Sequence, residues 1–440
     1  MTSYEIGLWS LGAILALIYT GMHVAIALAL VSFVGIWLLR DSPDQAARIM
    51  SLATRESISS YLFGVVPLFV LMGLVVSRAN IGRDTFDVAS RLFGKLRGGL
   101  GISTVGANAI FASITGISIA SAAVFTKIAV PEMMRAGHTA RFSTGVVVGS
   151  SILGMLLPPS LLMILYGILT EQSVGALFIA GIGPGILVTV IFCIGIWLMS
   201  RFWPSYTGVA VPTQSDAVGA LAVWKDVSSK LAPIVLLVAL VLGGLYGGIF
   251  TPTEAGAIGA LGAIVIAFVK RRLTGKVLWQ VTIETGHITA SICFLIIAAT
   301  MYSRMLALSG LPVYMTEAVV AMDVGMYGFI ILYILVLVLL GTILDSSSIL
   351  LITVPLALPV AQSLGIDLIW FGMITILAVE IGLLTPPMGL SVFVVKGALD
   401  DPNVSLGDVF MGAAPFALLM LVALAIIVAF PWITLGLLPA

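Results

Sequence analysis

Charge is scarce in this chain of 440 residues: 9% of them are Asp, Glu, Lys or Arg, whereas 60% are hydrophobic. The mean hydropathy is +1.20. This composition excludes an ordinary soluble domain and predicts an all-α polytopic membrane protein within a lipid bilayer. The 20 basic and 20 acidic residues cancel, so net charge indicates no nucleic-acid partner. No basic segment precedes the first apolar stretch, so we expect that stretch to be retained rather than cleaved as a signal peptide.

Residues with reactive or metal-binding side chains are equally few. The two cysteines, Cys193 and Cys293, each lie in an apolar run without a partner at useful spacing, and the three histidines are scattered. The pattern therefore excludes a disulfide framework and a transition-metal site. It contains no glycine-rich phosphate loop of the Walker type. Because no nucleophile with a base stands out either, we expect neither an enzyme nor a bound cofactor.

Two double prolines stand out against this apolar background. Pro158-Pro159 follows Gly154, and Pro386-Pro387 follows Gly382 in a second segment of similar shape. Proline lacks an N–H and clashes with the preceding helical turn, so each pair predicts a broken membrane helix. One such pair is compatible with a simple packing kink. Two in corresponding positions instead favour the binding site of a secondary transporter, where freed backbone groups line a cavity.

An offset of 228 residues, the separation of Pro158 from Pro386, relates the two halves of the chain. It predicts a first repeat over 1–204, a polar linker over 205–230 and a second repeat over 231–440. Matching segments in the two halves are 6–20 with 234–248, 22–39 with 250–267, 58–78 with 286–306, 83–93 with 311–321, and 175–203 with 412–435.

Two further matched segments, 99–131 and 327–359, have a length that fits neither one membrane span nor two. Each holds about 33 residues, against the ~20 that one span requires. Both contain glycine and hydroxyl residues near the middle, which suits a tight turn. We therefore expect a re-entrant helical hairpin in each repeat. Each hairpin is followed by a proline-broken helix, at about 142–166 and about 370–394.

Lysine and arginine predict the orientation of the repeats, because basic loops stay in the cytoplasm. The segments 309–328 and 361–370 hold no Lys or Arg, so we place them outside. The corresponding region of the first half is basic, which makes the repeats inverted. Basic residues assigned to the cytoplasm are Arg78, Arg83, Arg91, Lys95, Arg97, Arg135, Arg141, Lys270, Arg271, Arg272 and Lys276.

Asp345 is the most informative charge, since it stands alone in the apolar run 329–360. An ionisable residue at that depth is a candidate functional site. Asp before three serines is also a good helix N-cap, and both roles are compatible. For Glu254 we favour an ordinary helix start, because it follows Thr251 and a proline. The roles of Glu380, Lys127 and Arg304 stay open, the last two being able to reach the membrane surface or an anionic substrate.

A sodium site requires only oxygen ligands, which the hairpin tips and the proline breaks supply as hydroxyls and carbonyls. Half-helix N-termini at the tips would face an anionic substrate. The candidate sodium ligands are Ser118, Gly154, Gly341, Asp345, Ser346, Gly382 and Thr385. The candidate substrate-binding residues are Gly116, Ser118, Ser121, Pro158, Pro159, Ser160, Pro386 and Pro387.

Several motifs along the chain together resemble the large membrane subunit of TRAP (tripartite ATP-independent periplasmic) transporters. The motifs are Pro67-Leu68-Phe69, Pro131-Glu132-Met133, Gly154-x-Leu-x-Pro-Pro-Ser160, Leu177-Phe178-Ile179-Ala180-Gly181-Ile182-x-Pro184-Gly185, Thr251-Pro252-Thr253-Glu254-Ala255 and Leu384-Thr385-Pro386-Pro387-x-Gly389. The resemblance covers nearly the whole chain. One departure lies at the first hairpin tip, where the family usually has Gly-Ser-Ser-Ala and this chain has Gly116-Ile117-Ser118-Ile119-Ala120-Ser121.

The resemblance implies an elevator-type sodium symporter with the fold of the ion transporter superfamily. It implies two partners, a small four-helix membrane subunit and a periplasmic substrate-binding protein that delivers an organic acid. We therefore expect sodium-driven import of an organic anion, a carboxylate such as a dicarboxylate or sugar acid, across the bacterial inner membrane. The alternative is a stand-alone cation/proton antiporter of the same superfamily. A membrane scaffold without transport activity would not explain the paired breaks.

Overall fold

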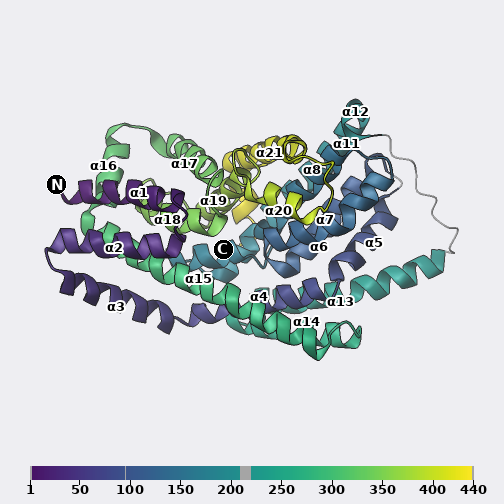
Figure 1. The fold of residues 1–440 in the computed structure, drawn as a ribbon, viewed down its shortest axis with the longest axis horizontal. Helices are drawn as coiled ribbons and strands as arrows, with labels where there is room; N and C mark the ends of the chain where they lie inside the picture. The colour runs from purple at the N-terminus through teal and green to yellow at the C-terminus, as the bar shows by residue number, and fades with distance from the viewer. Residues whose placement is uncertain (1, 95, 209–219, 439–440) are drawn as a thin grey trace.

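A computed structural model describes residues 2–94, 96–208 and 220–438, and these residues form an all-helical molecule (Figure 1). Lys95 and residues 209–219 of the expected linker lie outside the described residues. In the described part, six helices are long and apolar enough to cross a membrane, or up to eight if each of two bent helix pairs counts as one span. The prediction of a polytopic α-helical membrane protein is therefore confirmed.

One group of helices forms an elongated layer along the lower side of Figure 1, where α2 packs on α15 and α14 packs on α4 and α13. The helices of this layer are α1 (Ser3–Tyr19), α2 (Val24–Arg40), α3 (Pro43–Ser59), η1 (Tyr61–Gly64), α4 (Val65–Arg78), α13 (Ala220–Tyr246), α14 (Pro252–Val269) and α15 (Gly275–Ser309). The helix α3 is amphipathic and was not expected from the sequence, and α13 begins inside the range expected to be a polar linker.

The second group holds the helices that cover the ranges where hairpins and broken helices were expected. Its first-half members are α6 (Gly99–Thr115), α7 (Ser118–Arg135), α8 (Ala140–Ser151), α9 (Leu153–Leu156), α10 (Leu161–Thr170), α11 (Val174–Phe202) and α12 (Pro204–Thr207). Its second-half members are α17 (Gly325–Gly341), α18 (Ser346–Ser363), α19 (Leu368–Gly382), α20 (Leu390–Ala398), α21 (Leu406–Ala429) and α22 (Trp432–Leu435). The helix α8 is buried from Phe142 onward and α19 from Trp370 onward, so both helices lie in the core of this group, and α21 packs on each of them.

Local signals explain where the helices begin. Thr251 and Glu254 form a capping box at the start of α14, with Pro252 at the first helical position. The interpretation of Glu254 as a helix-start residue is thus confirmed. Asp367 caps α19 through the backbone N–H groups of Ile369 and Trp370, both at 2.9 Å. Such caps satisfy N–H groups that have no partner inside the helix.

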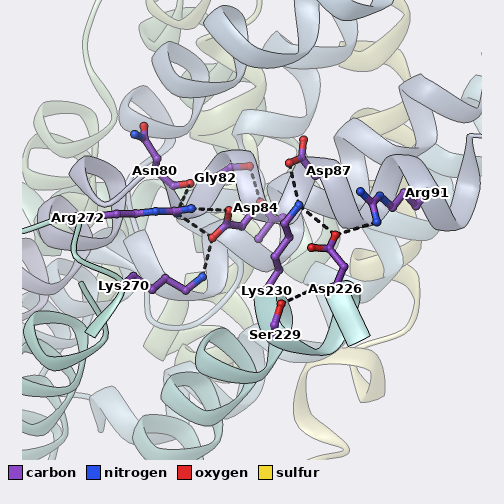
Figure 2. Close-up of polar contacts among 11 residues, drawn as sticks. Asn80, Gly82, Asp84, Asp87, Arg91, Asp226, Ser229, Lys230, Lys270 and Arg272 are labelled. Carbon is purple, nitrogen blue, oxygen red and sulfur yellow. Dashed lines mark hydrogen bonds and ion pairs between the residues drawn. The ribbon is translucent and has the colours of Figure 1, made fainter. Parts of the chain in front are cut away.

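The two groups are joined by α5 (Ile81–Phe93), which covers the amphipathic segment expected at 83–93, and by α16 (Leu311–Ala321), which covers the matched segment 311–321. α5 packs on α6 of the second group and on α13 of the first. Asp84 on α5 is nearly fully buried and accepts hydrogen bonds from Lys270 Nζ at 2.6 Å and from Arg272 Nη1 at 2.8 Å (Figure 2). These contacts attach α5 to the loop between α14 and α15.

A second set of ion pairs attaches α5 to α13 nearby. Lys230 lies between Asp87 and Asp226, with its Nζ 3.2 Å from a carboxylate oxygen of each, and Arg91 reaches Asp226 at 2.8 Å (Figure 2). These side chains are more exposed than Asp84. Each set includes basic residues that the charge rule assigned to the cytoplasm, namely Lys270 and Arg272 in the first set and Arg91 in the second.

Candidate functional site

The turn between α6 and α7 lies against the first proline break. The chain leaves α6 at Gly116, whose φ of +64° favours glycine, and Leu161 N donates to Gly116 O at 3.2 Å across the break. A Cβ at position 116 would lie 2.6 Å from Pro159 O, and one at Gly154 would lie 3.0 Å from Ser118 N. The backbones of turn and break therefore touch, and side chains larger than hydrogen would separate them.

The turn between α17 and α18 lies against the second proline break in a similar way. Met388 N donates to Thr342 O at 3.1 Å, a counterpart of the bond between Leu161 and Gly116. A Cβ on Gly341 would lie 2.7 Å from Gly382 Cα, so these two glycines set the closest approach. The peptide bonds within both proline pairs are cis. Each half of the chain thus brings a helix turn and a proline break together.

The hydroxyls expected at the breaks are used within the breaks themselves. Ser160 Oγ donates to Met155 O and accepts from Met163 N at 3.4 Å, which caps α10 and satisfies a carbonyl freed by the prolines. Thr385 Oγ1 donates to Ile381 O at 2.9 Å. These hydrogen bonds satisfy backbone carbonyl groups that would otherwise be unpaired within the membrane.

The two breaks differ in exposure. Pro158, Pro159 and Ser160 are buried, whereas Pro386 and Pro387 are exposed and Met388 is 52% exposed. The break between α19 and α20 is therefore the accessible one in this conformation. It leads into α20, whose first turn has no side-chain cap. Uncapped N–H groups at a helix start attract anions.

Asp345 caps α18, as one of its two expected roles requires. Its Oδ2 accepts from Ser347 N at 3.1 Å and from Ser348 N at 3.2 Å, and the Ser348 hydroxyl donates to its Oδ1. This arrangement uses both carboxylate oxygens in the cap. It also places a negative charge at the positive end of α18, a favourable interaction with the helix dipole.

The first residues of α7 and α18 meet at a carboxylate whose role the sequence left open. Ser346 Oγ donates to Glu380 Oε1 at 2.8 Å, and the Ser118 hydroxyl lies beside the same side chain. All three residues are nearly fully buried. Neither Glu380 Oε2 nor Ser118 Oγ has a hydrogen-bond partner among the described residues. Two of the candidate sodium ligands, Ser118 and Ser346, are therefore brought together by Glu380.

A separate buried network joins the first helix pair to α8. Asn108 Nδ2 donates to Ser150 Oγ at 2.6 Å, and Ser121 Oγ donates to Asn108 Oδ1 at 2.7 Å. All three side chains are inaccessible. Ser121, a candidate substrate ligand, is thus occupied between α6 and α7. Sequence reasoning did not select Asn108 or Ser150, although an amide inside an apolar helix is the kind of signal that would have drawn attention to Asn108.

Lys127 and Arg304, the other two charged residues whose roles the sequence left open, lie near the surface. Arg304 forms an ion pair with Glu56, which joins α15 to α3, and Lys127 is exposed on α7. Within the described residues no group of three or more His, Cys, Asp or Glu side chains is placed to hold a metal ion.

Several known proteins are similar to this chain along nearly its whole length. The family model described as "Tripartite ATP-independent periplasmic transporter, DctM component" matches residues 11–433. The chain is 34% identical to the C4-dicarboxylate TRAP transporter large permease protein DctM of Pseudomonas aeruginosa, over 91% of each chain. It is 31% identical to the sialic acid TRAP transporter large permease protein SiaM of Vibrio cholerae, over 96% of each chain.

Among solved structures, the chain is similar to the YdaH transporter of Alcanivorax borkumensis. The TM-score is 0.60 at 15% sequence identity, and the similarity covers 90% of each chain. At that identity the similarity concerns the fold alone.

Proposed function

This chain belongs to the DctM-component family of tripartite ATP-independent periplasmic transporters, and we propose that it is the subunit through which a sodium gradient drives import of an organic anion. It is a multi-pass membrane protein and a transporter permease rather than an enzyme. The observation that carries the proposal is the paired docking of a helix turn on a proline break, by Leu161 on Gly116 and by Met388 on Thr342. Broken helices that meet at a common centre are where secondary transporters hold substrate and coupling ion.

The substrate in this proposal is a carboxylate, which would bind at the exposed break near Pro386 and Pro387. The uncapped start of α20 supplies N–H donors there, and α7, which packs on α20, also begins without a side-chain cap. The names of the two relatives, for a C4-dicarboxylate and for sialic acid, support an acid as substrate. Sodium would bind among Ser118, Gly154 and the α18 start, held by oxygen atoms.

The moving part in this proposal comprises α6–α10 and α17–α20, and α1–α3 with α13–α15 form the stationary part. The halves 1–204 and 231–440 are then inverted repeats, with their hairpins entering from opposite sides of the inner membrane. The ion pairs of Asp84 support this division, because they fix the first turn of α5 to the α14–α15 loop of the stationary part. The family's small membrane subunit would bind the stationary part, and a periplasmic binding protein would deliver substrate.

Reconstitution of the chain with its small subunit and binding protein in proteoliposomes tests the proposal. We expect uptake of at least one member of a panel of dicarboxylates, sialic acid and sugar acids. Uptake should require both an inward sodium gradient and the binding protein. Equal uptake with potassium replacing sodium would refute sodium coupling. Robust transport of free substrate by the isolated chain would instead identify a stand-alone carrier.

A further inference from the structure

A groove of about 500 Å³ opens on the surface where the end of α4 packs on the first half of α15. Its lining is polar for the wall of a membrane span. The lining residues are Arg78, Gln280, Ile283, Glu284, His287 and Ile288. Arg78 is the last residue of α4, and its Nη2 lies 2.7 Å from Glu284 Oε2. Both side chains stay accessible, at 51% and 38% exposed, so the groove presents a positive and a negative group side by side.

The length of α15 places this groove near one surface of the membrane. The helix has 35 residues, which at 1.5 Å per residue is about 52 Å, whereas the hydrocarbon core of a bilayer is about 30 Å thick. Part of α15 must therefore lie outside the hydrocarbon. Trp279, 66% exposed, precedes Gln280 on this helix, and tryptophan is enriched at the level of the lipid headgroups. The polar residues of the groove follow it within two turns.

The 228-residue offset between the halves relates this ion pair to a second one. Glu284 corresponds to Glu56, which pairs with Arg304 near the other end of α15. Arg78 corresponds to position 306, two residues from Arg304. Each repeat thus places an acid at the same repeat position and pairs it with an arginine of a neighbouring helix. Exposed ion pairs contribute little to stability, so stability alone does not explain why the arrangement occurs twice.

The polar groups of the groove are complementary to a headgroup that carries both a phosphate and a primary ammonium. The Arg78 guanidinium suits a phosphate, and the Gln280 amide and the His287 ring add N–H donors. The Glu284 carboxylate suits an ammonium group that donates hydrogen bonds. A purely anionic headgroup would be repelled by Glu284, and a choline headgroup has no N–H to donate to it. Ile283, 44% exposed, offers apolar surface beside these groups.

We propose that this groove binds a zwitterionic phospholipid with a primary ammonium group, of the phosphatidylethanolamine type. Its phosphate lies at Arg78 and its ammonium at Glu284, while its acyl chains follow the exposed apolar surface of α15. The bound lipid holds the end of α4 against α15 within the part of the protein that we propose to be stationary. The site concerns neither the transported anion nor the coupling ion, so its test is independent of both.

Native mass spectrometry of this chain in complex with its small subunit measures the binding. The complex is titrated with phosphatidylethanolamine, phosphatidylcholine and phosphatidylglycerol that carry the same acyl chains. Wild type should bind the ethanolamine lipid most tightly. Arg78→Gln should weaken that binding about 10- to 100-fold, the loss expected for one hydrogen bond to a charged group. Glu284→Gln should remove most of the preference for ethanolamine over choline, because the neutral amide no longer attracts the ammonium.

Glu132→Gln is the matched control. Glu132 also forms an exposed ion pair, with Arg135 at 2.8 Å, but it lies on α7 and outside the groove. This variant should bind all three lipids as wild type does. Because exposed pairs add little stability, Arg78→Gln and Glu284→Gln should keep the wild-type melting temperature. Should either fail to fold, Gln280→Ala, which removes one donor to the phosphate, should still weaken binding of the ethanolamine lipid.

Three results would overturn the lipid site. The first is equal binding of the ethanolamine and choline lipids by wild type, and the second is a loss in Glu132→Gln as large as that in Arg78→Gln. The third concerns the occupant of the groove. In a cysteine-free background, Gln280→Cys that cross-links to the small subunit, with no lipid retained, would assign the groove to that subunit. Displacement of the lipid by an equal concentration of soluble glycerophosphoethanolamine would likewise assign it to a water-soluble phosphate ester.

Discussion

Replacing Asp84 by asparagine should destabilise the protein far more than the same change at Asp87, one turn further along α5. Asp84 has 5% of its side chain exposed and pairs with both Lys270 and Arg272. Removing one partner of a buried ion pair costs about 3–5 kcal/mol, because the remaining charges are left uncompensated. Lys270 and Arg272 are 17% and 35% exposed, so water screens part of that loss. The cost for Asp84→Asn is therefore at the lower end, about 3 kcal/mol.

The control variant, Asp87→Asn, should lose less stability because its ion pair is more exposed to water. The Asp87 side chain is 40% exposed and its partner Lys230 is 22% exposed. Exposed pairs contribute about 0.2–1 kcal/mol, so Asp87→Asn should cost roughly 0.5 kcal/mol. For a chain of this length, about 3 kcal/mol corresponds to a fall of about 3–6 °C in melting temperature.

The assay is thermal unfolding in detergent, followed by tryptophan fluorescence at one fixed scan rate, because membrane proteins of this size unfold irreversibly. A double variant, Asp84→Asn with Arg272→Gln, measures the coupling between the two side chains, and its cost should fall short of the sum of the single costs. The reasoning is refuted if Asp84→Asn lowers the melting temperature no more than Asp87→Asn does.

Three further predictions concern topology, the cap of α18 and the closest backbone contact. In a cysteine-free background, Arg135→Cys and Gln362→Cys should react with an impermeant thiol reagent from opposite sides of the membrane; labelling from one side would contradict the inverted repeat. Asp345→Ala should lower the melting temperature by the equivalent of about 1 kcal/mol, whereas Asp345→Asn should not, since asparagine also caps helices; equal losses would show that charge rather than capping matters. Gly382→Ala should destabilise the protein and abolish uptake, because its Cβ would lie 2.5 Å from Gly341 Cα; near-normal uptake would show that the two helices can separate there.

Much of the helical pattern could be predicted, because proline, glycine and charge mark helix ends in a membrane protein. The turn of the first helix pair was expected near the middle of 99–131, and α6 ends at Thr115. Glu254 was expected to begin a helix, and it does. α3 was missed because its sequence is amphipathic rather than apolar, so a search for apolar spans passes over it.

The composition of the site was harder to predict, since it depends on which helices meet. Ser118 and Ser346 are 228 residues apart, the offset that relates the two halves, so the sequence marks them as counterparts. It does not show that both lie beside Glu380, because that contact depends on how the helices pack. Glu380 shows its importance only once α19 is known to be buried at the centre. Likewise, the bond from Asn108 to Ser150 requires α6 and α8 to pack together. Local signals predict where a helix begins and ends, whereas such contacts arise only from tertiary packing.

The contact between α8 and α21 has a consequence for how the protein is assembled during synthesis. A Cβ on Gly145 would lie 2.0 Å from Gly412 O, so these helices touch backbone to backbone, and Arg141 pairs with Asp408 at 2.7 Å beside them. The paired residues are 267 positions apart. At about 5–20 residues per second, the ribosome takes on the order of tens of seconds to cover that distance. During this interval the glycine face of α8 is not yet covered by α21. The nascent first half therefore depends on the translocon or on lipid to cover this face until α21 has been synthesised.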